Sequence, residues 1–126
     1  MRVQSISAVF AALLVTMTVA PAAEAHHSFA VFDFKTEVPF EGIVESVKFR
    51  NPHIALTLKV KGADGKEQIV EFIEGAPANM LVRGGLRPEE IAPGKHINAI
   101  GSPLIEDHTK YFLRVIKLDD GQEFRN

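Results

Sequence analysis

The stretch from Ile54 to Val60 (IALTLKV) limits the possible folds of this 126-residue chain more than any other segment. Its apolar side chains occupy every second position, which is the period of a β-strand with one buried face. The sequence that follows, Gly62-Ala63-Asp64-Gly65, is typical of a hairpin turn. The strand predicted next, from about Glu67 to Ile73, is apolar on both faces, which indicates a position at the centre of a closed sheet.

A long first strand is predicted upstream of this hairpin, from Val38 to Arg50. Its apolar residues change parity around Gly42, which indicates a bulge or a sharp coil where a side chain would obstruct the neighbouring chain. Asn51-Pro52 ends the strand because proline lacks the N–H that a ladder requires.

Downstream, the pattern predicts one short helix and two further strands. Pro77 suits a first helical turn, and Gly84-Gly85 ends the helix. The predicted elements are a helix over Ala78–Arg83, a possible further turn from Arg87 to Glu90, strands over His96–Gly101 and Tyr111–Leu118, and a short tail through Phe124. This order favours an all-β fold with one short helix, a five-stranded OB-like Greek-key barrel; a β-sandwich is the alternative, because strand count alone does not separate the two.

The first 25 residues have the three parts of a secretory signal: the positive start Met1-Arg2, an apolar run from Ile6 to Ala20, and the small-residue pattern Ala23-x-Ala25. We therefore expect residues 1–25 to be removed and residues 26–126 to form a single periplasmic or secreted domain, with no membrane segment after cleavage. A cut after Ala22 is the alternative, and it would leave His26 inside the chain.

Composition excludes several classes of function. The chain has no cysteine, which excludes thiol catalysis, disulfide bonds and copper centres that need a thiolate. Its formal net charge of −2 gives it no overall attraction to nucleic acid or to an anionic membrane. We therefore expect no nucleic-acid partner.

Several short motifs together resemble an uncharacterised family, a domain-of-unknown-function group of small exported bacterial proteins. The motifs are His26-His27-Ser28-Phe29, Gly42-x-Val44, Asn51-Pro52-His53, Ala76-Pro77, Arg83-x-Gly85 and Pro93-Gly94. The HHSF start and the NPH triplet are the most specific of these. The chain departs from the family's usual pattern at Phe49 and Leu86, where tryptophan is usual. The resemblance implies export and the fold, and no established activity.

Histidines carry the chemistry that the sequence offers. If cleavage follows Ala25, the α-amino group and Nδ1 of His26 can close a six-membered chelate on one metal ion. A second imidazole completes the three-nitrogen set called a histidine brace, and such a set suits Cu(II) first and zinc less well. We expect His53, between the first two strands, to supply that imidazole, with His27 or His108 assisting.

Each histidine also has an alternative interpretation. His26 and His27 beside a cleavage site are also consistent with a solvated terminus that binds nothing. His53 after Asn-Pro could cap a turn or bond to the backbone, and His108 fits an ordinary loop residue. His96 at a strand start is interpreted as a surface or structural histidine rather than a ligand.

Three functions follow from these interpretations. The first is copper binding or delivery to a periplasmic protein partner, without turnover. The second is a redox enzyme that uses the same brace; it ranks lower because its usual aromatic substrate platform is missing from a chain with no tryptophan and one tyrosine. The third is a metal-free OB-like module that binds a protein, peptide or oligosaccharide.

Overall fold

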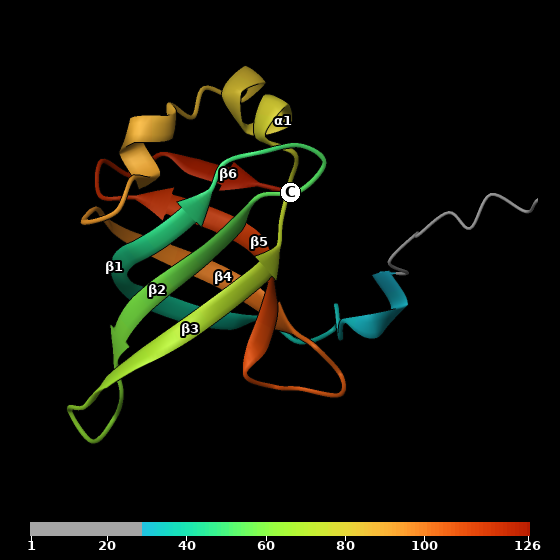
Figure 1. Cartoon of the computed structure of the whole chain (residues 1–126), viewed down its shortest axis with the longest axis vertical. Helices are drawn as coiled ribbons and strands as arrows, with labels where there is room; N and C mark the ends of the chain where they lie inside the picture. The colour runs from blue at the N-terminus through green and yellow to red at the C-terminus, as the bar shows by residue number, and fades with distance from the viewer. Residues whose placement is uncertain (1–28) are drawn as a thin grey trace, which may run out of the picture.

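The computed structural model describes residues 29–126, and these residues form one β-barrel with short helices at one end (Figure 1). In chain order the elements are the 3-10 helix η1 (Phe29–Val31), β1 (Val38–Lys48), β2 (Ala55–Lys61), β3 (Glu67–Glu74), α1 (Ala78–Arg83), the 3-10 helix η2 (Pro88–Ile91), β4 (His96–Pro103), β5 (Lys110–Leu118) and β6 (Glu123–Arg125).

The strands close into a five-stranded barrel. β1 pairs antiparallel with both β2 and β4, β2 pairs with β3, and β4 pairs with β5. A parallel pairing of β3 with β5 joins the two ends of the sheet. This topology confirms the predicted OB-like barrel and rules out the sandwich. The predicted tail is in fact a sixth strand, β6, which pairs with β5 outside the barrel ring because Phe124 is buried against the core.

Strand β1 lies very close to β2 at Gly42. A Cβ built there would lie 2.2 Å from the carbonyl oxygen of Lys59, so the prediction that a side chain would obstruct at Gly42 is confirmed. The bulge itself lies further along, because the register of β1 against β2 shifts between Val44 and Ser46. Val44 points into the core and Ile43 is exposed, so the switch of faces predicted at Gly42 occurs after Val44.

Strand β3 pairs with β2 on one side and with β5 on the other, as predicted for a strand inside a closed sheet, but only one of its two apolar faces is buried. Val70 and Phe72 are buried, whereas Ile69 and Ile73 lie on the outer surface. The reason is the closed barrel, in which one face of each strand points into the core and the other has no layer to cover it.

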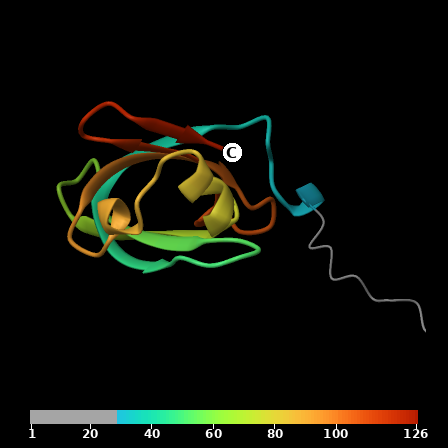
Figure 2. The same ribbon diagram turned by 90° about the horizontal axis from the view of Figure 1, so that it is seen from above.

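The helical segment covers one end of the barrel. Figure 2 looks onto this end and shows α1 and η2 lying across the ring of strands. Leu81, Leu86 and Ile91 are buried there and extend the barrel core. The predicted helix over Ala78–Arg83 is confirmed with the same bounds. Within residues 29–126, no helix has the length and apolar character needed to span a membrane.

Candidate functional site

The loop between β1 and β2 is held against the segment that follows β3, and this contact positions His53. Three backbone N–H groups bridge the two segments: that of Ile54 donates to the Ala76 carbonyl at 3.1 Å, that of Ala78 to the Arg50 carbonyl at 3.2 Å, and that of Asn79 to Asn51 Oδ1 at 3.1 Å. The Asn51–Pro52 peptide bond in this loop is cis. Because the loop is tied to this segment at three points, the backbone position of His53 within it is fixed.

The half-buried ring of His53 adds a fourth bond to this set, because its Nδ1 lies 2.9 Å from the carbonyl oxygen of Gly75. A carbonyl oxygen can only accept, so Nδ1 carries a proton and donates it. In the neutral ring, Nε2 then carries the lone pair. Metal-binding histidines commonly have this arrangement, with one ring nitrogen bonded to a carbonyl and the other directed at the metal.

The other predicted ligands are not brought to His53 within the described residues. His26 and His27 lie outside residues 29–126, so their predicted roles remain predictions. His108 lies in the β4–β5 loop, as predicted, where it is exposed and lines a surface hollow together with Phe34 and Ile105. Across residues 29–126, no group of three or more His, Asp or Glu side chains is placed to hold a metal ion.

The first described residues run along one end of the barrel close to the segment that accepts the His53 bond. Val31 accepts the N–H of Ile105 at 2.8 Å, and Phe32 forms a β-bridge with Leu104. Between η1, the end of β3 and the β4–β5 loop lies a cleft of about 410 Å³, named here the N-terminal cleft. It is lined by Ala30, Val31, Phe32, Ile73, Glu74, Leu104, Ile105 and Glu106.

From the sequence, Glu74 was only a weak candidate for a catalytic carboxylate, together with Glu71, Glu41 and Glu45, and a solvated strand face was the preferred interpretation. It was one of several glutamates spread over the strands, and the pattern gave no reason to prefer it. In the fold it is half-buried at the end of β3, and the next residue is Gly75, the acceptor for His53. The one available signal was its position directly before the Gly-Ala-Pro break.

A second polar cluster surrounds His96 on another side of the barrel. Its Nδ1 lies 2.6 Å from Asp119 Oδ1, and its Nε2 lies 3.0 Å from Glu41 Oε1. The hydrogen bond to Asp119, with further help from Glu41, holds the pKa of His96 above its usual value of 6.5. The cluster links β1, β4 and the turn after β5, which matches the interpretation of His96 as a structural histidine.

This cluster predicts a pH-dependent contribution to stability. Because the folded pKa of His96 is raised, the stabilisation is fully present below about pH 6.5 and is lost as the pH rises through the folded value. Replacing His96 by glutamine should remove this pH dependence and cost at most about 1 kcal/mol at pH 6, the range of solvent-screened surface pairs. Urea unfolding of both proteins from pH 5.5 to 8.5 measures this; parallel curves for the two proteins would contradict it.

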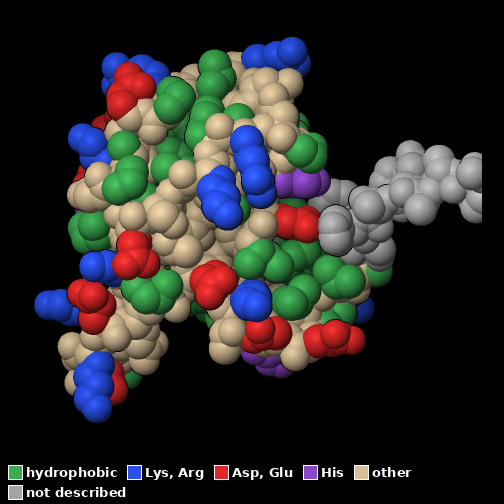
Figure 3. All heavy atoms as spheres, viewed as in Figure 1, with side chains coloured by type: hydrophobic (Ala, Val, Ile, Leu, Met, Phe, Trp, Pro, Cys, Tyr) green, Lys and Arg blue, Asp and Glu red, His purple; other side chains and the backbone are tan. Residues whose placement is uncertain are grey.

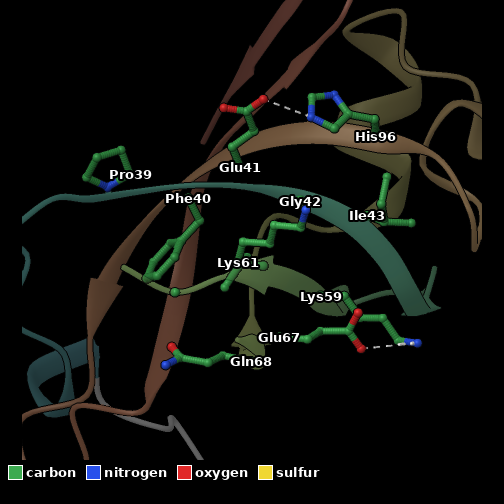
Figure 4. Close-up of a pocket in the computed structure, with 12 residues that line it drawn as sticks. Pro39, Phe40, Glu41, Gly42, Ile43, Lys59, Lys61, Glu67, Gln68 and His96 are labelled. Carbon is green, nitrogen blue, oxygen red and sulfur yellow. Dashed lines mark hydrogen bonds and ion pairs between the residues drawn. The ribbon is translucent and has the colours of Figure 1, made fainter. Parts of the chain in front are cut away.

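A groove of about 710 Å³, named here the β1 groove, separates the first half of β1 from the β2–β3 hairpin (Figure 4). In the described chain the pairing of β1 with β2 begins only at Gly42, so residues 38–41 pair with β4 alone. Phe40 points from β1 toward the barrel, with its ring 5.6 Å from Phe72 and 4.8 Å from Tyr111. The groove therefore has an aromatic base and an open strand edge.

Comparison with protein families matches most of the chain to a family of unknown function. A family model described as a family of unknown function, DUF6152, covers residues 13–111, which is well over half of the chain. The chain belongs to this family. No curated protein and no solved structure matches it.

The DUF6152 match spans all the histidines discussed above, from His26 to His108. It ends at the start of β5, so most of that strand and β6 lie beyond it. The predicted membership of an uncharacterised family is thereby confirmed. DUF6152 carries no assigned activity, so the function of this barrel has to be argued from its residues.

Proposed function

We propose that this DUF6152 domain is exported, that its mature chain begins at His26, and that it binds Cu(II) without turnover. In this proposal the α-amino group and Nδ1 of His26 chelate the ion and Nε2 of His53 completes the three-nitrogen set. His27 or His108 assists, and zinc is a weaker alternative ion. A periplasmic or secreted protein of this kind would bind the metal or pass it to a partner.

The hydrogen bond between His53 Nδ1 and the Gly75 carbonyl is the observation that supports this proposal best. It fixes the ring orientation and gives Nε2 the lone pair that a metal ion requires. This bond to a backbone carbonyl is also what the alternative interpretation of His53 predicted. A histidine that merely capped its own turn would, however, bond within the β1–β2 loop. His53 instead bonds to a residue 22 positions away, on a segment that is itself tied to the loop.

Chain geometry also supports the proposal. Ala30 lines the N-terminal cleft together with Glu74, the residue directly before Gly75. His26 is three residues before Phe29, where η1 begins, so a fully extended segment between them would span roughly 10–11 Å. The carboxylate of Glu74 also adds negative charge on this side of the barrel, which favours a divalent cation.

Replacing His53 by alanine tests the proposal directly. We expect the affinity of the mature protein for Cu(II) to fall at least about tenfold, the size of effect that follows loss of support at a metal site. Calorimetric titration measures the affinity, and EPR of the Cu(II) form should show fewer nitrogen ligands. The matched control is His96→Gln, which removes an imidazole on another side of the barrel and should leave both readouts unchanged. Equal affinities for His53→Ala and the parent protein would contradict the assignment.

The β1 groove favours a second candidate function, the binding of an extended peptide at a strand edge. Val44 donates its backbone N–H to the Lys95 carbonyl at 2.8 Å. In this part of β1, the main-chain N–H and C=O groups of even-numbered residues therefore point toward β4, and those of odd-numbered residues point toward the groove. Two odd-numbered residues lie before the pairing with β2 begins. Pro39 has no N–H to offer, whereas Glu41 presents both its N–H and its C=O to the groove. Peptides add to such edges by main-chain bonds. If the domain is a metal-free module with this function alone, the mature protein shows no tight Cu(II) binding in the same titration.

A further inference from the structure

We propose that the β1 groove binds an extended peptide in which an acidic side chain stands next to an apolar one, and that the ammonium group of Lys61 pairs with the carboxylate. The inference rests on the second candidate function, the binding of a peptide at the edge of β1. It adds the chemical class of the peptide. In strand-edge binding the main-chain bonds give affinity, and the side-chain contacts decide which peptide is bound.

The charges that line the groove are paired except at Lys61. Figure 3 shows basic and acidic side chains mixed over the projecting β2–β3 hairpin, so individual pairs decide what the groove attracts. His96 Nε2 donates to the carboxylate of Glu41 at 3.0 Å, and the carboxylate of Glu67 lies 3.7 Å from the ammonium group of Lys59 (Figure 4). Lys61 lines the same groove but has no ion pair within residues 29–126. The groove therefore offers one cation that no carboxylate of the described chain occupies.

Lys61 stands where the groove begins to open. The pairing of β1 with β2 stops at Gly42 and Val60, and Lys61 is the next residue of β2, opposite Glu41. Its exposed side chain points from β2 toward β1 in Figure 4. A strand added along residues 38–41 of β1 therefore meets this ammonium group. An acidic side chain on such a strand gains an ion pair there, in a groove that shields the pair from part of the solvent.

The rest of the groove suits an apolar neighbour of the acidic residue. The apolar lining comes from Pro39, Phe40, Ile43 and Val60, and Ile43 exposes 40% of its surface. Successive side chains of a strand point to opposite sides, so the residue next to the acid is directed at a different wall of the groove. An apolar side chain there removes this lining from water. A basic peptide is disfavoured, because its charge would lie beside Lys61.

An NMR titration of the mature protein with three capped heptapeptides tests the inference. The peptides differ only in the central residue, which is glutamate, glutamine or lysine, placed between two valines with threonine elsewhere. We expect the glutamate peptide to shift the amide signal of Glu41 and to bind about two- to fivefold more tightly than the glutamine peptide, the range of a solvent-screened ion pair. The lysine peptide should bind most weakly. The amide of Arg125 is the control, because β6 ends the strand order of the sheet and offers another strand edge.

A pair of charge variants assigns the preference to one residue. Lys61→Glu should reverse it, so that the lysine peptide binds more tightly than the glutamate peptide. Lys66→Glu changes an exposed lysine of the same hairpin that does not line the groove, and it should keep the order of the parent protein. Equal affinities of the parent for all three peptides, or an unchanged order in Lys61→Glu, overturn the acidic preference and leave strand-edge binding in place. If no peptide shifts Glu41, or if Arg125 shifts equally, the second candidate function fails and the inference fails with it.

Discussion

In a His27→Ala background, a mature chain that carries one additional residue before His26 is expected to bind Cu(II) at least about 100-fold more weakly than the correctly processed protein, a loss of about 2.7 kcal/mol. The background is needed because the extension would otherwise place His27 third in the chain, where it can bind Cu(II) together with the new terminal amine and the peptide nitrogens between them. The extra residue converts the α-amino nitrogen of His26 into a peptide nitrogen. That nitrogen holds a proton and has no lone pair to donate, so the six-membered chelate with Nδ1 cannot form in the same way. Calorimetric titration of the two purified forms, each checked by mass spectrometry for its first residue, measures the difference.

Two controls sharpen this experiment. In a His53→Ala background the same extension should cost less than it does in the parent protein, because both changes act on one site and their effects do not add. The affinity of the processed form should also be lower at acidic than at neutral pH, since a protonated imidazole cannot bind a metal. Equal affinity for the processed and the extended protein would exclude the brace and favour the metal-free module.

The strands were predictable because their signal is local. The alternation from Ile54 to Val60 and the turn at residues 62–65 define β2 and the hairpin within a dozen residues. The placement of His53 between the first two strands followed from Pro52, which cannot continue a ladder. Such features depend on neighbours in the chain and therefore survive without any knowledge of the fold.

Which of the two apolar faces of β3 is buried could not be predicted, because burial depends on what covers a strand. Ile69 and Ile73 are as apolar as Val70 and Phe72, but they lie on the outer face of the barrel, which has no second layer. β6 was missed for a related reason. Residues 123–125 are too few to show a period, and they form a strand only because β5 offers them a free edge.

The polar contacts of the candidate site could not be predicted, because they join residues far apart in the sequence. His53 reaches Gly75 over 22 positions, and His96 reaches Glu41 over 55. Histidine spacing indicated which residues to consider, whereas the closed barrel decided which carbonyl or carboxylate each ring meets. The tautomer of His53, on which the copper proposal depends, is therefore a property of the tertiary structure and not of the NPH triplet.

Replacing Gly42 by alanine is expected to destabilise the barrel by about 3 kcal/mol, the upper part of the usual range for overpacking. The new methyl group would lie 2.2 Å from the Lys59 carbonyl oxygen, which is backbone and cannot rotate away. Either β1 or β2 must shift, and this shift would disturb the first two residue pairs between the strands, Gly42 with Val60 and Ile43 with Lys59. For a domain whose total stability is about 5–15 kcal/mol, this is a large fraction. Urea unfolding at pH 7 measures the change.

Gly84→Ala is the matched control for this substitution. Gly84 follows α1 with a φ of −74°, a value that alanine adopts without strain, and its nearest contact for a Cβ is 3.3 Å, to the carbonyl oxygen of Leu81. We expect its cost to stay below about 1 kcal/mol. Similar losses for the two variants would show that β1 and β2 can separate at Gly42 without penalty. The close crossing at Gly42 would then not be what fixes the path of β1, and the β1 groove beside it would be free to change its width.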